Sequence, residues 1–326
     1  MKKKLQIGIL DYSDLSRMSG GLSPTTIKEM QALREEIKKA GHVPVVYKVP
    51  KCQMYFHGRK AEILYNNKKI KGCDVLIPRV AVTTRIDLEV SLVKQFQMMD
   101  IPVVNDYLSI SRAKNKLRTL QILCNKNLPV PRTIVVRKFE FIDEAIKQVG
   151  GYPVVLKAPF GSYGAGVVIV ESRRSLYSAL DVIWLSMQTN IILIQEYVAE
   201  AYGSDYRIFV VGDKVVAAMK RTAKTGDFRS NLHLGGEASK VDLTDEEKRI
   251  AIKSTQAMGL QMAGVDILRS NHGPVIMEVN GNPGFFGLAN VTGVNVAKHV
   301  VDFAIEYALK ARIKNEAKKL AAKKRR

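Results

Sequence analysis

The sequence predicts an α/β protein that begins with an open sheet of parallel strands and continues with antiparallel hairpins. Three observations support this prediction. Short apolar runs alternate with helical periodicity over residues 1–105, the texture changes at Asp106, and hairpin signatures follow at 205–219 and 264–284. The length of 326 residues exceeds what one small core requires, so we expect two or three subdomains.

The composition is that of an ordinary globular protein, with 46% hydrophobic and 25% charged residues. The net charge of +20 exceeds what solubility requires and predicts acidic partners, such as nucleotide phosphates, nucleic acid, a polyanionic substrate or anionic lipid. Residues 311–326 carry eight Lys and Arg against one Glu, and the rest of the chain keeps a net charge of +13.

The three cysteines, Cys52, Cys73 and Cys124, are widely spaced and form no metal or redox motif, which indicates reduced thiols. The basic start of the chain precedes only about six apolar residues, too few for the apolar core of a signal peptide. No apolar run approaches the roughly 18 residues of a membrane span. We therefore expect a cytoplasmic protein without a membrane partner.

The first 105 residues predict strands that alternate with helices. The expected strands are at 5–10, 43–49, 74–78 and 101–105, with a polar insertion between the second and third, and the expected helices are at 25–40 and 88–99. In an open α/β sheet the carboxyl ends of the strands face a binding crevice. Arg79 follows the third strand at this edge, so it is a candidate for an acidic substrate, with a surface arginine as the alternative.

From residue 106 onward the pattern predicts further strands and helices. The expected helices are at 109–125, 143–149, 175–186, 244–258 and 295–312, and the expected strands are at 134–136, 152–157, 167–170 and 191–194, besides the two hairpins. Thr244 and Glu247 have the spacing of a capping box at the start of one helix.

A glycine-rich loop at 160–166 lies between two predicted strands, directly after Lys157. A Walker A loop or a dinucleotide fingerprint would be followed by a helix, so both are excluded. Gly161, Gly164 and Gly166 can still let the loop fold over phosphates, because glycine leaves the backbone amides accessible. An ordinary flexible hairpin tip is the alternative, and the preceding lysine favours a phosphate-binding flap.

Two further segments carry groups suited to a nucleotide. Glu196, Tyr197 and Val198 end a predicted strand, where backbone groups beside a glutamate acceptor suit an adenine ring. Residues 220–236 form a polar, glycine-punctuated segment rich in basic residues and amides. Neither pattern identifies a ligand by itself.

The hairpin at 264–284 brings oxygen ligands together. Glu278 and Asn280 are two residues apart and share a face, and Asp266 lies opposite Glu278 or, after a slip of the register, opposite Asn280. Mg²⁺ prefers such oxygen ligands together with nucleotide phosphates. The alternative is a solvated hairpin face, but these acids interrupt apolar strands, where burial without a partner costs several kcal/mol. The sequence therefore favours a metal site.

The order and spacing of these segments resemble the ATP-grasp superfamily and, within it, the RimK-type ribosomal protein glutamate ligases. The most specific segments are RAKNKLR, VVGDKVVAAMKR, GDFRSNLHLGGEAS and AGVDILRSNHGPVIMEVN. The resemblance implies an α/β fold that is α+β in its two-lobed ATP-grasp part. The implied domains are an open α/β pre-ATP-grasp domain at 1–105, a small lobe with the glycine flap at 106–192, a large lobe with the metal hairpin at 193–310, and a basic, disordered tail at 311–326.

The resemblance further implies ATP-dependent ligation of a carboxylate to an amine through an acylphosphate. Glutamate would be added to the C-terminus of a small-subunit ribosomal protein or to another acidic peptide, with ATP and two Mg²⁺ or Mn²⁺ ions as cofactors. The resemblance implies a homo-oligomer, either a dimer or a tetramer. The polybasic tail is either a solvated end or a tether to ribosomal RNA.

The resemblance also implies roles for individual residues. Those expected to contact ATP are Lys116, Lys157, Gly161, Ser162, Gly164, Gly166, Glu196, Tyr197, Val198, Asp205, Arg229, Ser230 and Asn231. Those expected at the transferred phosphoryl group are Arg229, Asn231, Arg207 and Arg221. Those expected to hold the metal are Asp266, Glu278 and Asn280, and those expected to contact the substrate are Arg79 and Asn282.

Asn282 and residues 284–287 depart from the usual family sequence just beyond the metal hairpin, which leaves the acceptor open. One alternative is a ligase for a small-molecule or carrier-protein carboxylate. Another is a non-catalytic, nucleotide-gated module that binds RNA, although the phosphate lysines and metal ligands argue against it. A Ser–His–Asp set and a GxSxG elbow are both absent from the sequence, which argues against a covalent protein intermediate.

Overall fold

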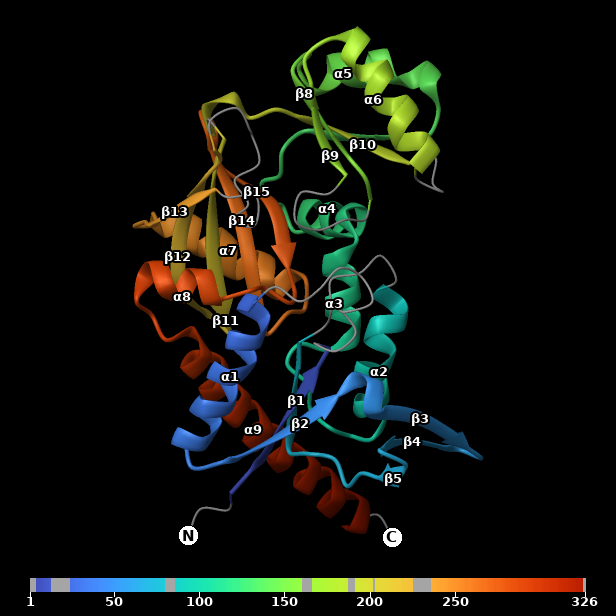
Figure 1. Ribbon diagram of the computed structural model, residues 1–326, viewed down its shortest axis with the longest axis vertical. Coiled ribbons are helices and arrows are strands. Elements are labelled where there is room, and N and C mark those ends of the chain that lie inside the picture. Colours follow the sequence, from blue (N-terminus) through green and yellow to red (C-terminus); the bar gives the residue numbers. More distant parts are fainter. Residues whose placement is uncertain are drawn as a thin grey trace.

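The computed structural model describes residues 4–12, 24–79, 86–159, 166–186, 191–201, 203–224 and 236–324 (Figure 1). The described strands form four sheets, and the predicted α/β fold class is confirmed. In Figure 1 a four-stranded sheet lies at the top, a five-stranded sheet in the middle and a parallel three-stranded sheet at the bottom, with both termini below it.

The N-terminal sheet has parallel strands in the order β2-β1-β6. Its elements are β1 (Gln6–Asp11), β2 (Val43–Lys48) and β6 (Val75–Arg79), with the helices α1 (Pro24–Lys39) and α2 (Ile86–Met98). Beyond its first residue β1 is completely buried, as expected of a central parallel strand. The predicted strand at 101–105 is reduced to a parallel bridge between Leu76 and Val103, beside Pro102, which has no backbone N–H for the ladder.

The insertion between β2 and β6, predicted only as polar, forms a small antiparallel sheet. Its elements are a 3₁₀ turn (Val49–Lys51) followed by β3 (Cys52–His57), β4 (Lys60–Tyr65) and β5 (Lys68–Lys69), in the order β3-β4-β5. Ile63 of β4 is completely buried in the same cluster as Phe96 of α2, so it anchors the small sheet to the domain.

The predicted basic helix at 109–125 is wrong as a single element, because the structure has two helices, α3 (Tyr107–Lys114) and α4 (Lys116–Asn125). Asp106 caps α3 by accepting hydrogen bonds from two backbone N–H groups of its first turn. Asn115 has extended dihedral angles, and its side chain accepts from the Arg118 backbone N–H, so it caps α4. Asparagine favours such a break because its side chain competes for backbone hydrogen bonds.

The upper sheet is antiparallel, in the order β7-β10-β8-β9. Its elements are β7 (Thr133–Val136), a 3₁₀ turn (Phe139–Phe141), α5 (Ile142–Val149), β8 (Val154–Lys157), β9 (Val167–Val170), α6 (Arg173–Ser186) and β10 (Ile192–Glu196). Helices α5 and α6 cover one side of it (Figure 1). Because β10 lies inside this sheet, the predicted boundary between the lobes at residue 192 is wrong, and the sheet extends to Glu196.

The middle sheet is antiparallel, in the order β13-β12-β11-β14-β15, and both predicted hairpins are confirmed. Its elements are a 3₁₀ turn (Ala199–Ala201), β11 (Ser204–Val211), β12 (Lys214–Thr222), β13 (Glu237–Lys240), α7 (Asp245–Ala257), β14 (Met262–Ser270), β15 (Gly273–Asn280), α8 (Phe286–Thr292) and α9 (Val296–Lys324). Helix α7 covers one face and starts with the predicted capping box of Thr244 and Glu247. Helices α8 and α9 pack against apolar residues at one end of the opposite face.

Helix α9 continues to Lys324, so the predicted disordered tail at 311–326 is wrong for the residues described. The segment has neither Gly nor Pro and is rich in Ala and Lys, which favour helix. Arg312 Nε lies 3.1 Å from Glu316 Oε1 one turn later. Within the described part of the chain, the helices are too short or too polar to cross a membrane.

Candidate active site

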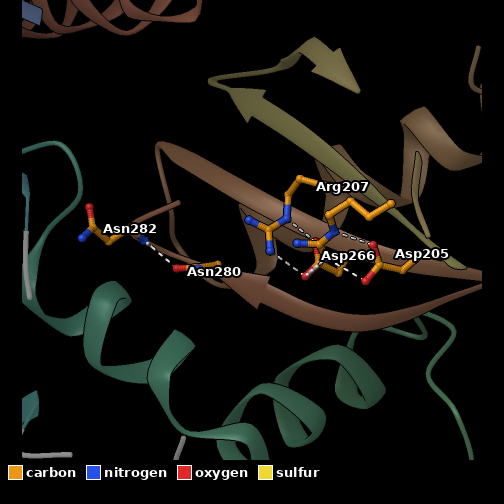
Figure 2. A network of polar contacts seen from close by, with 6 residues as sticks. Asp205, Arg207, Asp266, Asn280 and Asn282 are labelled. Carbon is orange, nitrogen blue, oxygen red and sulfur yellow. Dashed lines mark hydrogen bonds and ion pairs between the residues drawn. The ribbon is translucent and has the colours of Figure 1, made fainter. Parts of the chain in front are cut away.

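One face of the middle sheet carries alternating buried charges (Figure 2). The members are Asp205 and Arg207 on β11, Arg221 on β12 and Asp266 on β14, which the antiparallel register places side by side. Arg221 donates from Nε and Nη2 to the two oxygens of Asp205 at 2.6 and 2.7 Å. Arg207 donates to both oxygens of Asp266, with 2.7 Å between Nη2 and Oδ2, and Arg221 Nη2 lies 3.0 Å from the same Oδ2.

This ion cluster holds its charges at neutral pH. Burial raises the pKa of Asp266, but the guanidinium groups of Arg207 and Arg221 more than offset this effect and hold the pKa below its usual range. Burial lowers the pKa of Arg221, but the carboxylates of Asp266 and Asp205 raise it above its ordinary value. Asp266 therefore stays a carboxylate and Arg221 a cation, each compensated by its neighbours.

The predicted metal ligands share this face. The register places Glu278 opposite Asp266, the first of the two registers that the sequence allowed. Asn280 follows on the same face, and its Oδ1 accepts from the Asn282 backbone N–H at 3.0 Å (Figure 2). Glu278 and Asn280 are half-buried, whereas Asp266 is almost completely buried.

The donor set fits a hard cation, with a restriction at Asp266. A carboxylate offers about four lone-pair sites, and Asp266 already accepts three N–H groups from Arg207 and Arg221. Asp266 can therefore take one further ligand, and the more accessible oxygens are those of Glu278 and Asn280. Among the described residues, no three His, Cys, Asp or Glu side chains form a metal-ligand group, so a metal here depends on two carboxylates and an amide.

Three lysines interact electrostatically with Glu278. Lys114 ends α3, Lys116 begins α4, and Lys157 ends β8 in the upper sheet. Burial lowers the pKa of each lysine, and the attraction of Glu278 opposes this effect in all three. For Lys157, burial and repulsion from Lys116 lower the pKa to about 8. Phosphate oxygens would stabilise these buried cations, because charge-assisted hydrogen bonds replace the hydration that burial removes.

Hydrogen bonds within the upper sheet position Lys157. Its Nζ donates to Gln195 Oε1 at 2.5 Å, and Gln195 Nε2 donates to Thr133 Oγ1 at 2.7 Å. Neither this role of Gln195 nor that of Lys114 was predicted from the sequence. Asn115 between two lysines is a helix-cap signal that could have indicated Lys114, whereas Gln195 is 38 residues from Lys157 and has no local signal.

The loop predicted as a phosphate flap joins antiparallel strands, because β8 pairs with β9. The Ala158 N–H donates to the Gly166 C=O at 3.0 Å, and Gly166 has a φ of +72°, a conformation that favours glycine. The other predicted members of the loop, Gly161, Ser162 and Gly164, lie outside the described residues, as do Arg229, Ser230 and Asn231.

The predicted adenine segment begins at the end of β10. Arg132 binds the Glu196 carboxylate, which accepts from Arg132 Nε at 2.5 Å and from the Arg132 backbone N–H at 2.9 Å and keeps about two lone-pair sites for a ligand. This partner lies 64 positions away in sequence. Tyr197 and Val198 follow the strand, and the predicted contact of the segment with adenine stays a prediction.

Arg79 is buried where the N-terminal sheet meets the chain beyond β15, so the prediction that it faces an open crevice is wrong. Arg79 Nη2 lies 2.6 Å from Glu29 Oε2, and both Nη atoms donate to the Pro283 C=O at 3.2 Å. Glu29 Oε1 accepts from the backbone N–H groups of Phe285 and Phe286 at 2.6 and 2.9 Å. The Glu29–Arg79 ion pair therefore holds the segment that follows the metal hairpin.

Asn282 lies in this held segment, next to a second brace. Asn105 donates to the C=O groups of Met262 and Gly281, both at 2.7 Å, and thereby joins the start of β14 to the end of β15. Asn282 itself is 9% exposed. Its predicted contact with a substrate stays a prediction.

Two family models together match most of the chain. Residues 22–110 match the RimK PreATP-grasp domain, and residues 113–304 match the RimK-like ATP-grasp domain. The chain is 42% identical over 286 residues to a probable alpha-L-glutamate ligase of Nitrosococcus oceani, which spans 88% of this chain and 94% of that protein. It is 44% identical over 277 residues to probable alpha-L-glutamate ligase 1 of a Shewanella species, spanning 85% and 91% of the two chains.

Solved structures share the fold at lower identity. The ATP-grasp ligase PsnB, in complex with a phosphomimetic variant of its minimal precursor, Mg and ADP, has a TM-score of 0.69 at 18% identity, over 92% of this chain and 98% of that chain. The RimK domain protein of Sphaerobacter thermophilus has a TM-score of 0.68 at 22% identity, over 92% and 99% of the two chains. D-alanine–D-alanine ligase of Bacillus anthracis in complex with ATP has a TM-score of 0.66 at 18% identity, over 96% of this chain and 100% of that chain.

Proposed function

This chain belongs to the RimK-like ATP-grasp family and is an ATP-dependent ligase, and we propose that it is an alpha-L-glutamate ligase that extends the C-terminus of a small-subunit ribosomal protein. The observation that carries the proposal is a charged sheet face on which Glu278 lies opposite Asp266 and attracts Lys114, Lys116 and Lys157. Lysine cations together with a carboxylate suit a nucleoside triphosphate and its metal ion. The substrate class in this proposal, glutamate, comes from the relatives that are named as glutamate ligases.

The reaction needs positioning and charge neutralisation more than covalent chemistry from the protein. A carboxylate oxygen of the acceptor attacks the γ-phosphorus of ATP, and ADP leaves. The amine of glutamate then attacks the acyl carbon, the phosphate leaves, and the nitrogen loses a proton as the amide forms. Lys116 and Lys157 would hold the phosphates, and Gln195 would keep Lys157 aimed at them.

The fit of the oxygen donors supports a metal requirement. Glu278, Asn280 and the remaining lone-pair site of Asp266 would hold Mg²⁺ or Mn²⁺, which when bound supplies further neutralisation of the phosphate charge. Arg207 and Arg221 would orient Asp266 rather than act alone, because both donate to it.

The experiment that tests this function combines the purified protein with ATP, Mg²⁺, glutamate and one acceptor at a time. The acceptors are the C-terminal peptide of a small-subunit ribosomal protein, the same peptide with an amidated C-terminus, and a small-molecule carboxylate. We expect ADP release and addition of glutamate residues, measured by mass spectrometry, with the first peptide and not with the amidated one.

The outcomes separate the candidate functions. If the small-molecule carboxylate is the one acceptor that gives turnover, the protein is a ligase for a small-molecule carboxylate and the ribosomal acceptor is ruled out. ADP release with no acceptor, or none with any acceptor mixture, would contradict the ligase that we propose. The Glu278→Gln variant serves as the matched inactive control in each mixture.

A further inference from the structure

The small sheet β3-β4-β5, which projects at the lower right of Figure 1, has one face that points away from the domain. Ile63 of β4 marks the inner face, because it is completely buried against the domain. Residues directly opposite each other in an antiparallel pair share a face, and neighbours along a strand alternate. The register therefore defines the outer face, whose members are Gln53, Tyr55, His57, Lys60, Glu62, Leu64 and Lys69.

Two aromatic rings stack on the outer face. The ring centroids of Tyr55 and His57 are 4.7 Å apart, and the ring planes are inclined by 22°. Glu62 Oε2 lies 3.3 Å from His57 Nε2, and the same carboxylate pairs with Lys69, so these contacts orient the His57 ring. Tyr55 is 46% exposed and the His57 side chain 40%, so both rings keep surface on which a planar group can stack. The outer face therefore offers a preformed platform for nucleic-acid bases.

Cations surround this platform. Residues 51–71 contain one acidic residue, Glu62, and have a net charge of +5, against +20 for the whole chain. Their cationic residues are all exposed: Lys51, Arg59, Lys60, Lys68, Lys69 and Lys71. Within the described part of the chain, Lys69 is the member of this set that forms an ion pair, and its partner is Glu62. The small sheet therefore has a surplus of exposed positive charge that suits a polyanion.

The positions of the apolar side chains favour nucleic acid among the polyanions. An anionic membrane would take up one continuous apolar face, but Met54 and Phe56 lie on the face opposite to Tyr55, and the turn at the tip contains Arg59. An acidic peptide would use the cations and leave the rings unused. A single-stranded nucleic acid uses both, because its phosphates bind the cations and its unpaired bases stack on the rings.

Gln53 adds a group that can contact ribose. It lies on the outer face two residues before Tyr55, and its Nε2 donates to Asn67 Oδ1 at 2.9 Å while its Oε1 accepts from the Asn67 backbone N–H at 3.3 Å. A side-chain amide has two N–H donors and two acceptor lone pairs, so these bonds use half of its capacity. The ribose 2′-hydroxyl both donates and accepts, and proteins distinguish RNA from DNA through it.

We propose that the outer face of the small sheet binds single-stranded RNA. Bases stack on Tyr55 and His57, the surrounding cations bind the phosphates, and Gln53 contacts a ribose hydroxyl. Stacking and phosphate contacts do not read base edges, so the preference for sequence is weak. This surface is independent of the proposed ligase site and of the basic end of α9, because its residues all lie within 51–71.

The first test measures binding of a fluorescent single-stranded RNA of about 12 nucleotides to the full chain by fluorescence anisotropy. We expect Tyr55→Ala to raise the Kd about tenfold with an unchanged melting temperature, and Tyr55→Phe, which keeps the ring, to bind like the wild type. Phe56→Ala is the matched control, because it removes a ring that is 64% exposed on the opposite face, and it should also bind like the wild type. Absence of binding by the wild type, or equal Kd values for Tyr55→Ala and Phe56→Ala, would overturn the proposal.

Three further ligands test the occupant in the same assay: duplex RNA, single-stranded DNA of the same sequence, and a polyglutamate peptide of the same charge. Tyr55→Ala should leave the Kd for the duplex and for the peptide unchanged, because neither has an unpaired base. The DNA should bind several-fold more weakly than the RNA, and Gln53→Ala should remove that difference. An equal loss of RNA and peptide affinity in Tyr55→Ala would contradict stacking, and equal binding of RNA and DNA by the wild type would contradict the assignment to RNA.

The salt dependence tests the phosphate contacts. Each phosphate contact with a single strand contributes about 0.7 to the slope of log Kd against log salt concentration, so Arg59→Gln with Lys60→Gln should lower this slope by about 1.4. The control is Lys214→Gln with Lys253→Gln, which replaces exposed lysines of β12 and α7 and should keep the slope. The basic end of α9 is the same in every variant, so its contribution cancels from the comparison. An equal slope in the two double variants would overturn the proposal.

Discussion

Two buried sets of arginine and carboxylate side chains lie in this molecule, and they differ in what surrounds them. The other hydrogen bonds of the Glu29–Arg79 pair go to backbone groups, namely the Pro283 C=O and the N–H groups of Phe285 and Phe286. The cluster around Asp266 lies on a sheet face that continues to Glu278, which attracts the half-buried Lys114 and Lys116 and the buried Lys157. The same ion-pair chemistry therefore closes a junction in one place and borders the proposed nucleotide site in the other.

Burial alone therefore does not identify a catalytic charge. Breaking a buried ion pair leaves the remaining charge without compensation, which is a cost in stability wherever it occurs. A functional charge differs because its partner is a ligand, so removing it changes binding and turnover more than folding.

Replacing Arg79 should affect folding more than any other change. Arg79→Met keeps most of the side-chain volume but leaves Glu29 buried without its cation, so we expect a loss of about 3–5 kcal/mol in the free energy of unfolding, measured by urea denaturation. Adding Glu29→Gln should recover part of this loss. Unchanged stability together with a raised KM for the acceptor would restore the substrate role that the sequence suggested for Arg79.

Replacing Glu278 should lower turnover strongly and change stability little, the opposite of what we expect for Arg79. Glu278→Gln should lower kcat/KM roughly 100- to 200-fold, which corresponds to a loss of about 3 kcal/mol of transition-state stabilisation. The reason is that the variant lacks the carboxylate that would face the metal and the lysines. The free energy of unfolding should change by less than about 1 kcal/mol, since the side chain is half-buried. Glu237→Gln, at an exposed position of the same sheet, is the control and should match the wild type. Near wild-type turnover of Glu278→Gln would remove Glu278 from the site.

The affinity for ATP should depend on pH through Lys157. Burial lowers the pKa of this lysine to about 8, so its charge and its attraction for phosphate are lost as the pH rises above 8. We expect the Kd for ATP to rise by up to about tenfold per pH unit there, with proton uptake on binding that calorimetry in buffers of different ionisation enthalpy detects.

Unfolding of the protein does not account for this pH effect, because its sign is opposite. The unfolded chain keeps the lysine proton up to the ordinary lysine pKa of 10.5, so it binds more protons than the folded chain between about 8 and 10.5. The contribution of Lys157 to the free energy of unfolding should therefore rise with pH over that window. A pH-independent Kd for ATP would contradict the placement of Lys157 at the phosphates, and Lys157→Met should abolish the dependence.

Removing residues 311–326 should have the smallest effect on both fold and chemistry. Ala308 is buried, and the α9 side chains from Leu309 to Ala317 are half-buried or exposed, so stability and turnover with a free peptide should stay near wild type. We propose that this polybasic end contacts RNA near the acceptor. The eight Lys and Arg would then give a steep salt dependence of RNA binding that disappears on truncation, measured by filter binding. An unchanged salt slope would contradict this contact.

The sequence by itself determined the parts of the molecule that local pattern controls. Alternation along residues 264–284 placed Glu278 and Asn280 on one face, because successive strand residues point to opposite sides, whereas a register shift beside Ile267 puts Asp266 opposite Glu278. The capping box at Thr244 and the hairpin turns follow from residues a few positions apart. The order of the motifs identified the family, because each motif belongs to a separate element of the fold.

The tertiary structure alone decided which charged groups meet. Arg207 and Asp266 are 59 residues apart, and Arg79 and Pro283 are 204 apart, so sheet order and domain packing rather than local spacing bring them together. For the same reason Glu196 is bound by Arg132, and Lys157 by Gln195. A side chain of given charge has many candidate partners along a chain, and only the packed fold leaves one within hydrogen-bonding distance while it removes water from the others.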